Sequence, residues 1–319
     1  MKRIAVLTSG GDAPGMNAAI RAVARTCFFN GKECMGVVRG YEGLIDGEFI
    51  SLGRAAVGGI IHRGGTILKT ARSTRFLEPA GRQQAINRMN EAGIEGLVVI
   101  GGDGSYRGAK ELNAVGFPVI GIPGTIDNDI AGTDETIGFD TAINTALEAV
   151  IRLRDTASSH DRLFIVEVMG RNAGFVALEV AVASGAEYVV VPELPLSIGR
   201  LCEHLNYSQK NNKSHTLIIL AEGVMSGEEM RSKLQDTGGY EARVTVLGYI
   251  QRGGTPSSKD AVLASRLGAY AAESLFVGKS GLMVGCINNR MVLSPLERAW
   301  TEHKTISPEL IGLMEKLNV

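Results

Sequence analysis

The stretch from Phe117 to Asp129 reads FPVIGIPGTIDND and joins a short apolar run to a turn that carries two carboxylates. Continuous apolar runs of roughly four to eight residues, bounded by glycine, are typical of strands buried on both faces of a parallel sheet. Asp127 and Asp129 lie two residues apart, where their charges repel, and neither Asp nor Asn favours a strand or a helix. The cluster is therefore either a solvated turn or a place where charge takes part in chemistry.

The same pattern recurs along the chain, because other apolar runs also end in glycine-rich or polar loops. They are IAVL before TSGGDAPGMN, LVVI before GGDGS, FIVEVM before GRNAG, YVVVP before ELP, TLIILA before EGVMSG, and VTVLGYI before QRGGT. Residues 16–29 and 140–155 repeat their apolar side chains every 3.6 residues, as amphipathic helices do, and Asp140 is expected to cap the second helix. Alternating strands and helices predict an α/β fold with mainly parallel sheets flanked by helices. Ligands bind such sheets beyond the carboxyl ends of the strands.

Composition sets outer limits on function. The chain has 319 residues, of which 45% are hydrophobic and 21% charged, and its net charge of −1 gives no general attraction to nucleic acid or membrane. The four cysteines form no metal-binding pattern, so we expect them to be reduced and half-buried. No apolar run approaches the roughly 18 residues that span a bilayer, and the first residues lead directly into a strand-like run. We therefore expect a cytoplasmic protein.

Two glycine-rich loops follow the expected strands. Residues 10–17, GGDAPGMN, join a strand to a helix N-terminus, where backbone N–H groups hold anions, although a tight turn without a ligand would look the same. Residues 101–105, GGDGS, place Asp103 between two glycines. A carboxylate there is suited to hold Mg²⁺ beside phosphate, and the alternative is an Asx-turn.

Several arginines lie in the loops, and any one of them alone would be expected to be merely solvated. They are Arg72, Arg162, Arg171, Arg243 and Arg252. The tetrapeptide RGGT occurs at residues 63–66 and again at 252–255, which is either a reused loop or a coincidence. Phosphate-binding loops, a Mg²⁺ ligand, guanidinium groups and the Asp127 carboxylate are the parts that phosphoryl transfer to a hydroxyl needs. The sequence therefore predicts a kinase that acts on an alcohol.

In this order, GGDAPGMNA, GGDGS, PGTIDND, VMGR, AEG and QRGG resemble the bacterial ATP-dependent 6-phosphofructokinase family, and the resemblance covers essentially the whole chain. It implies two Rossmann-like domains. Residues 1–138 with about 251–300 would bind the nucleotide, and residues 139–250 with about 301–319 would bind the sugar phosphate. The implied reaction is phosphorylation of the C1 hydroxyl of fructose 6-phosphate by Mg-ATP, in a homotetramer whose active sites are shared between subunits.

The resemblance also implies residue roles. Asp127 would be the general base and Asp129 would support the arrangement of metal and charge. The catalytic set would be completed by Thr125, Arg171 and Arg72. The nucleotide would be held by Gly11, Arg72, Ser73, Gly102, Asp103, Gly104 and Ser105, with Asp103 on the Mg²⁺. Fructose 6-phosphate would be held by Thr125, Ile126, Asp127, Met169, Gly170, Arg171, Glu222, Tyr249, Ile250, Gln251 and Arg252, with Arg162 and Arg243 reaching in from a neighbouring subunit.

A second, allosteric site for ADP or phosphoenolpyruvate is implied as well. Its residues would be Arg21, Arg25, Arg154, Gly185, Glu187, Asn211, Lys213 and His215, with Glu187 on the Mg²⁺ of bound ADP. The chain departs from the family pattern at Tyr249, where His is usual, and at Asn211, where Lys or Arg is usual. We expect the second change to weaken allosteric control.

Glycine at residues 104 and 124 predicts ATP as the donor, because pyrophosphate-dependent relatives typically carry Asp and Lys at these positions. Three alternatives stay open at this point. They are a pyrophosphate-dependent phosphofructokinase, another kinase with a GGDG loop such as an NAD or lipid kinase, and a non-catalytic regulator that binds a sugar phosphate. The Asp127 and Asp129 pair disfavours the regulator, since extra carboxylates do not help to bind an anion.

Overall fold

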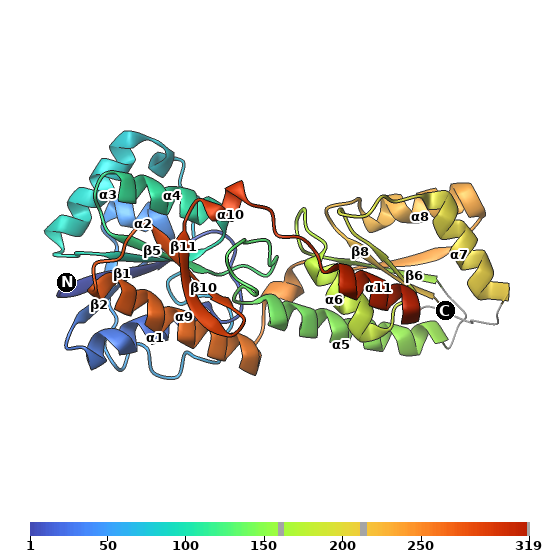
Figure 1. Ribbon diagram of the computed structural model, residues 1–319, viewed down its shortest axis with the longest axis horizontal. Coiled ribbons are helices and arrows are strands. Elements are labelled where there is room, and N and C mark those ends of the chain that lie inside the picture. Colours follow the sequence, from blue (N-terminus) through green and yellow to red (C-terminus); the bar gives the residue numbers. More distant parts are fainter. Residues whose placement is uncertain (159–162, 211–215, 318–319) are drawn as a thin grey trace. The chain divides into compact units, whose positions relative to one another are not determined.

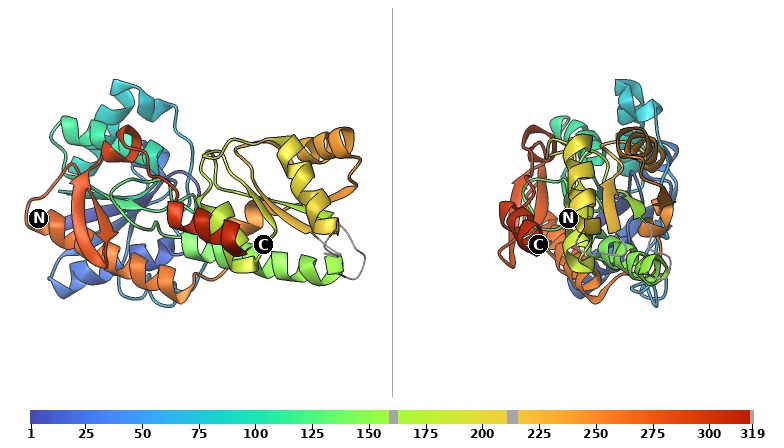
Figure 2. Two further views of the ribbon diagram at one scale, coloured as in Figure 1. Left: turned by 45° about the vertical axis from the view of Figure 1, so that its right-hand side comes forward. Right: turned by 90° about the vertical axis from the view of Figure 1, so that its right-hand side faces the viewer.

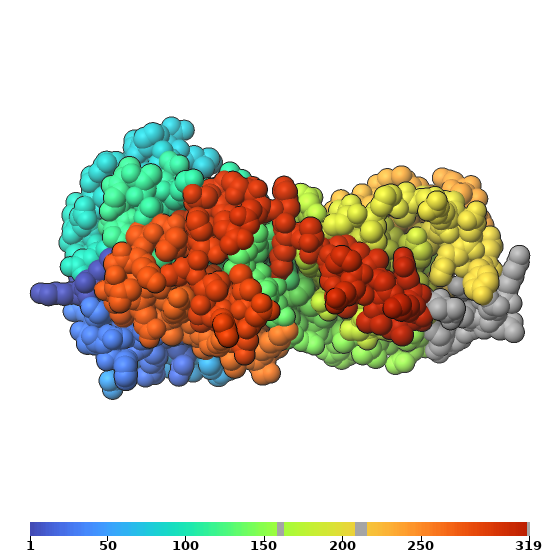
Figure 3. All heavy atoms as spheres, in the orientation of Figure 1, coloured from blue at the N-terminus to red at the C-terminus, as the bar shows by residue number. Residues whose placement is uncertain are grey.

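The computed structural model describes residues 1–158, 163–210 and 216–317. The chain forms two compact units. Unit 1 contains Met1–Thr141 and Arg252–Lys304, and unit 2 contains Ala142–Gln251 and Thr305–Val319. Each unit is thus built from segments that are far apart in the sequence, as the mixture of blue, green and orange-red surface in unit 1 shows (Figure 3).

The sheet of unit 1 has seven strands in the order β11-β10-β5-β4-β1-β2-β3. The strands are β1 (Arg3–Thr8), β2 (Glu33–Val37), β3 (Phe49–Ser51), β4 (Leu97–Gly101), β5 (Val119–Pro123), β10 (Leu282–Ile287) and β11 (Arg290–Pro295). Only the β2–β3 and β10–β11 pairs are antiparallel. Thr8 pairs with Ile100, and Gly101 pairs with Pro123, so β1, β4 and β5 end level with one another. The loops that follow these three strands therefore leave the sheet at one edge.

Helices cover both faces of this sheet (Figure 1). On one face lie α1 (Met16–Phe29) and α9 (Ser258–Phe276), which pack against each other. A Cβ on Gly268 would lie 2.7 Å from the Ala19 carbonyl oxygen, so glycine lets the two helices approach. The other face carries α2 (Gly40–Asp46), α3 (Pro79–Glu91), α4 (Asp103–Ala114) and the short α10 (Arg298–Thr301). The core beneath them includes Leu97, Tyr106 and Leu112, all fully buried.

Unit 2 has a smaller, wholly parallel sheet in the order β7-β8-β6-β9. Its strands are β6 (Leu163–Val168), β7 (Tyr188–Val190), β8 (Thr216–Ala221) and β9 (Ala242–Val246). Its helices are α5 (Phe139–Ser158), which starts within the last residues of unit 1's first segment, α6 (Phe175–Ser184), α7 (Ile198–Lys210), α8 (Gly227–Gly238) and α11 (Pro308–Leu317). In Figure 1, α7 and α8 cover one face of the sheet, and α5, α6 and α11 lie on the other.

The apolar runs predicted from the sequence form β1, β4 and β5 of unit 1 and the four strands of unit 2, with some local differences. The helix α5 begins at Phe139, so Asp140 lies in its first turn and is not the N-cap residue. The run VTVLGYI is a strand only as far as Val246, and Gly248–Arg252 forms a 3₁₀ helix, η2. All four cysteines are free and buried rather than half-buried. Among the described residues, none of the helices is both long and apolar enough to cross a membrane.

The orange-red C-terminal part of unit 1 lies among its blue and green N-terminal elements (Figure 2). β10 lies in the sheet between β5 and β11, although it comes late in the sequence. The segment that connects β3 to α3 is a long loop followed by the 3₁₀ helix η1 (Arg75–Leu77).

Candidate active site

The glycine-rich loops after β1 and β4 lie against each other. A Cβ on Gly10 would lie 3.4 Å from the Ser105 Oγ, and a Cβ on Gly101 would overlap the Ser105 side chain and the Ser9 carbonyl. Gly10 has φ 83°, and Gly15, just before α1, has φ 106°, which is the left-handed region that glycine adopts without strain. The backbone conformation favours glycine at residues 10 and 15, and the close packing requires it at residue 101. The N-termini of α1 and α4 lie at the same edge of the sheet.

Asp103 is the first residue of α4 and is half-buried. The N–H groups of Ser105 and Tyr106 donate to the Gly102 carbonyl, at 3.0 and 3.2 Å, and close the first turn of the helix. A Cβ on Gly104 would have no atom within 4 Å, so this position faces open space. The loop can therefore accept an anion beside the Asp103 carboxylate without moving its backbone.

Gly124 behaves differently from what we expected. A Cβ there would lie 2.9 Å from Ile100 Cγ2 and 3.2 Å from Met16 Cε. This glycine faces packed side chains, so the idea that it leaves room for the nucleotide is wrong. Its role is to let β5 end close to β4. The open space found at Gly104 alone bears on the choice of donor.

The loop after β5 carries the two carboxylates. The Thr125 hydroxyl donates to Asp127 Oδ2 at 2.9 Å, and the Asp127 N–H donates to Thr125 Oγ1 at 3.2 Å. Asp127 is 2% exposed, and Ile126 is equally buried. A Cβ on Gly102 would lie 3.9 Å from Thr125 Cβ, so this loop adjoins the GGDG loop. The loop that carries the buried Asp127 carboxylate thus adjoins the loop that carries Asp103 and Gly104.

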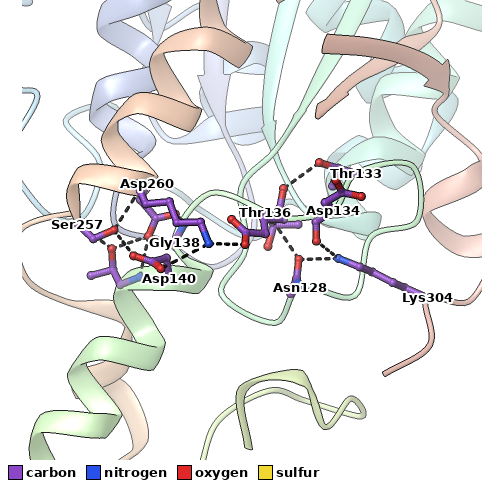
Figure 4. Close-up of polar contacts among 12 residues, drawn as sticks. Asn128, Thr133, Asp134, Thr136, Gly138, Asp140, Ser257, Asp260 and Lys304 are labelled. Atoms are coloured by element: carbon purple, nitrogen blue, oxygen red, sulfur yellow. Dashed lines mark hydrogen bonds and ion pairs between the residues drawn. The ribbon is translucent and has the colours of Figure 1, made fainter. Parts of the chain in front are cut away.

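A network of polar contacts fixes the far side of this loop (Figure 4). The Thr136 hydroxyl donates to the Thr125 carbonyl at 2.6 Å, and the Thr136 N–H donates to Asn128 Oδ1 at 3.1 Å. Lys304 Nζ also donates to Asn128 Oδ1, at 2.8 Å. Burial lowers the pKa of Lys304 to about 8, against the opposing pull of nearby carboxylates.

A second buried carboxylate anchors the start of α5 in the same view. Asp260 accepts hydrogen bonds from the N–H groups of Gly138 and Thr141, at 2.9 and 2.8 Å, and from the Thr141 hydroxyl. Burial raises the pKa of Asp260, and these donors oppose the rise. Neither Asp260, in α9, nor Lys304, in the segment after α10, belongs to a sequence motif, so neither residue was predicted.

The two RGGT segments lie against each other in unit 1. A Cβ on Gly64 would lie 3.1 Å from both the nitrogen and the carbonyl carbon of Gly254, and closer still to its oxygen. Asn17, at the start of α1, donates to the Arg63 and Gly64 carbonyls, at 3.0 and 3.2 Å. The repeated tetrapeptide is therefore a pair of loops in backbone contact.

Two predicted arginines belong to this part of unit 1. A Cβ on Gly11 would lie 3.0 Å from Arg252 Nη1, so the Arg252 guanidinium covers the first glycine-rich loop. Arg72 is exposed, and its neighbour Ser73 accepts a hydrogen bond from the Phe76 N–H at 3.2 Å.

In unit 2, the loop after β6 is held by side chains from two other segments. Glu222 Oε1 accepts hydrogen bonds from the Gly170 and Arg171 N–H groups, at 3.2 and 2.9 Å. Gln251 Oε1 accepts one from the Met169 N–H at 2.8 Å. Arg171 has φ 52°, an uncommon backbone conformation for a residue with a side chain. Five residues predicted to bind the sugar phosphate are therefore brought together in unit 2.

The other unit 2 residues predicted to bind the sugar phosphate are exposed or lie away from this group. Tyr249 and Ile250 are 79% and 58% exposed. Arg243 is the second residue of β9, so it lies at the opposite end of that strand from η2. It is exposed there, away from the loop of Arg171 and Glu222. Arg162 falls outside the described residues.

The predicted allosteric residues divide between the units. In unit 2, Arg154 donates to the Gly185 carbonyl at 2.6 Å and lies 4.0 Å from Glu187, whose other oxygen accepts the Leu217 N–H. In unit 1, Arg25 donates to the Arg54 carbonyl at 3.4 Å, and Arg21 is half-buried one turn earlier on α1. Asn211, Lys213 and His215 fall outside the described residues.

The comparisons with known proteins agree on one family. A family model described as phosphofructokinase matches residues 3–275. The chain belongs to the phosphofructokinase family. It is 52% identical over 319 residues to the ATP-dependent 6-phosphofructokinase of Shouchella clausii, with 100% of both chains covered. It is 54% identical over 324 residues to ATP-dependent 6-phosphofructokinase 1 of Thermus thermophilus, with 99% of each chain covered.

A solved structure of phosphofructokinase from Saccharomyces cerevisiae has the same fold. The TM-score is 0.88 at 34% identity, and the match covers 100% of this chain and 47% of the yeast chain. This chain thus spans about half the length of the yeast phosphofructokinase chain. These comparisons confirm the family and the α/β fold of helix-flanked sheets that were predicted from the sequence.

Proposed function

We propose that this protein is an ATP-dependent 6-phosphofructokinase that transfers the terminal phosphoryl group of ATP to the C1 hydroxyl of fructose 6-phosphate. One observation carries the proposal beyond the family. The buried Asp127 carboxylate accepts a hydrogen bond from the Thr125 hydroxyl, in a loop that adjoins the glycine-rich loop after β4. The names of the relatives, which are about half identical over their whole length, support the same activity.

In this proposal, unit 1 binds the nucleotide. The loop backbones at Gly11, Gly102 and Gly104 and the buried Ser105 hold the phosphates, and the N-termini of α1 and α4 supply favourable dipoles. Arg72 and Ser73 complete the nucleotide site. The open space beside Gly104 supports ATP over pyrophosphate, since a side chain at this position would occupy it.

Asp103 is the proposed ligand for Mg²⁺. Its half-buried carboxylate lies between two glycines at the mouth of the loop, and the space next to it suits a hydrated cation with phosphate. Among the described residues there is no cluster of three or more metal-ligating side chains. That fits Mg²⁺, which commonly takes one or two carboxylates together with water and substrate phosphates. When bound, the ion would neutralise charge on the phosphates.

Asp127 acts as the general base that takes the proton from the C1 hydroxyl. A carboxylate suits this task when it is fixed within reach of the acceptor, and the Thr125 hydroxyl restricts the rotation of Asp127. Asp129 adds negative charge that favours Mg²⁺. Arg171 and Arg72 offset the charge that develops on the transferring group, as guanidinium groups do in other phosphoryl transfers.

The residues predicted from the sequence to bind the sugar phosphate form its proposed binding site. Its core is the unit 2 group of Met169, Gly170, Arg171, Glu222 and Gln251, whose mutual hydrogen bonds define the loop geometry. The other members of the predicted set are Thr125, Ile126, Tyr249, Ile250 and Arg252. Arg162 and Arg243 would act from a neighbouring subunit. The position of Arg243 at the start of β9 supports this, because it lies far from the other residues of its own unit's set.

Quaternary structure, control and location complete the proposal. The protein is a cytoplasmic homotetramer with shared active sites. ADP and phosphoenolpyruvate compete for the second site, where Arg154, Gly185 and Glu187 already lie together. The Glu187 carboxylate already pairs with Arg154 and accepts a hydrogen bond from the Leu217 N–H, so the Mg²⁺ of ADP would have to compete with both. Asn211 supplies no charge where relatives have a cation, which weakens control.

A coupled assay of ADP release tests the activity. Purified protein should turn over with ATP and fructose 6-phosphate, and not with NAD or diacylglycerol as acceptor. Pyrophosphate releases no ADP, so this donor is tested by the formation of fructose 1,6-bisphosphate, and it should give none. Asp127→Ser should lower kcat by roughly 10²–10⁴, the usual cost of losing a general base, with little change in ATP affinity. The exposed Asp236→Ser on α8 serves as a control for the substitution itself. Turnover that survives in Asp127→Ser would refute the assignment of the base, and binding without turnover in the wild type would favour a regulator.

A further inference from the structure

Lys304 is the last residue of unit 1 and reaches the loop that carries the two carboxylates. It follows α10 and lies beyond the residues matched by the phosphofructokinase family model. Its Nζ donates to Asn128 Oδ1 at 2.8 Å and also to the Asp134 carbonyl. Figure 4 shows the side chain extending along the loop to these two acceptors. A lysine from the end of unit 1 is therefore in direct contact with the residue between Asp127 and Asp129.

Asn128 determines the direction in which the chain passes from Asp127 to Asp129. It is 4% exposed and has φ 54°, the left-handed conformation, which Asn adopts more readily than most residues with a side chain. Its Oδ1 receives both the Lys304 ammonium and the Thr136 N–H. The two donors fix the Asn128 side chain and with it the backbone turn. A change in that turn would rotate the Asp127 carboxylate.

The surroundings of Lys304 indicate that its charge is not there to stabilise the fold. Its half-buried ammonium costs desolvation energy, and burial lowers its pKa to about 8, while Asp134, Glu135 and Asp129 pull the pKa upward. Without the lysine, Asn128 Oδ1 would keep the Thr136 N–H, and the exposed Asp134 carbonyl could bind water. Removing the ammonium should therefore disturb the loop more than the folding equilibrium.

We propose that Lys304 is a positioning residue for phosphoryl transfer, which fixes Asn128 and thereby orients the Asp127 carboxylate toward the acceptor hydroxyl. The inference rests on the proposed function of Asp127. It adds a residue that touches neither reactant and acts through the side chain of Asn128.

Lys304→Met is the first test, because methionine keeps the length of the side chain and removes its donors. We expect kcat with saturating ATP and fructose 6-phosphate to fall about ten- to a hundredfold, the cost of misplacing a catalytic group by up to 1 Å. The KM for ATP should change less than twofold and the urea midpoint of unfolding should not fall. Lys304→Arg, which can still donate to both acceptors, should recover most of kcat.

Lys32 offers a matched control in the same unit. This part-buried lysine donates to the Met1 carbonyl, and its ammonium lies 4.7 Å from the centre of the Phe276 ring. Lys32→Met should lower the urea midpoint and leave kcat unchanged. The opposite response at Lys304 would distinguish positioning from a purely structural role.

A double-mutant cycle tests whether the effect passes through Asn128. Asn128→Gly removes the acceptor and still permits a positive φ, and in that background Lys304→Met should have no further effect on kcat. The proposal is overturned if Lys304→Met keeps the wild-type kcat, if kcat and the urea midpoint fall together, if Arg loses as much as Met, or if the two single effects multiply. A wild type without fructose 6-phosphate kinase activity would instead overturn the proposed function, and this role with it.

Discussion

Replacing Gly64 by alanine should impair the enzyme, although Gly64 is not among the residues predicted to bind either substrate. Gly64 is the first glycine of the first RGGT segment and Gly254 is the second glycine of the other, and their backbones are in contact. The backbone of Gly64 is not in the left-handed region, so alanine adds no torsional strain there. Its methyl group would, however, be directed at the Gly254 backbone, which cannot move aside as a flexible side chain could.

The size of the effect follows from the distances. The added Cβ would lie 3.1 Å from two backbone atoms of Gly254 and closer to a third, whereas ordinary van der Waals contact starts at 3.4 Å. The segments must part by up to about 1 Å, a misplacement that can cost on the order of 10²-fold in rate. Arg252 begins the second segment, and its guanidinium covers Gly11, so the displacement passes to that side chain. Overpacking should also cost about 1–3 kcal/mol of stability.

The assay is steady-state kinetics with fructose 6-phosphate as the varied substrate, supported by urea unfolding. We expect kcat/KM to fall roughly 10²-fold. Gly53→Ala is the control, because it lies in the loop before the first RGGT segment and an added Cβ there meets no atom within 4 Å. Its kinetics should match those of the wild type. Gly64→Ala with unchanged kcat/KM would refute the view that the paired loops set the position of Arg252.

Three further predictions concern the donor, the acceptor and pH. Gly104→Asp should abolish turnover with ATP, because the side chain would fill the open space and repel phosphate; undiminished ATP turnover in this variant would contradict that use of the space. Tyr249→His should lower the KM for fructose 6-phosphate, most clearly below about pH 7, where His becomes cationic and charge-assisted bonds are stronger; equal KM values for variant and wild type at every pH would count against a phosphate contact. Raising the pH through about 8 should lower kcat as Lys304 loses its proton. The unfolded chain keeps that proton up to its usual pKa of 10.5, so between the two values the folded state binds fewer protons and this group's contribution makes stability rise with pH. Measuring kcat and the urea midpoint of unfolding over the same pH range checks the predicted fall in kcat and rise in stability. Lys304→Arg should show neither change.

The sequence allowed the edge of the unit 1 sheet to be predicted well, because its loops combine strong local signals. Glycine after an apolar run marks the end of a buried strand, and Asp103 and Asp127 stand at such ends. The strands β2, β10 and β11 gave no comparable signal, since β2 and β11 are partly exposed and β10 ends at the tight turn that joins it to β11. Their places are set by tertiary packing.

Contacts between segments that are distant in the sequence could not be predicted. Gly124 appeared to leave room for a ligand, but whether a missing Cβ faces space or packed side chains depends on Ile100 and Met16. Lys304 has no motif around it, and only the folded chain brings it to Asn128. The repeat of RGGT was visible in the sequence, whereas the contact between the two copies was not.

The insertion of β10 beside β5 also affects how the chain can fold during synthesis. When the ribosome has produced Met1–Thr141, β5 has its partner β4 on one side and an open edge on the other, because β10 begins only at Leu282. An unpaired edge strand is a template for aggregation, and pairings between distant segments form slowly. The strands of unit 2 are all synthesised before this gap can be closed. A nascent chain therefore carries an incomplete unit 1 for most of its translation, and a chain that stops before Leu282 retains the strands of unit 2 but leaves the edge of β5 open.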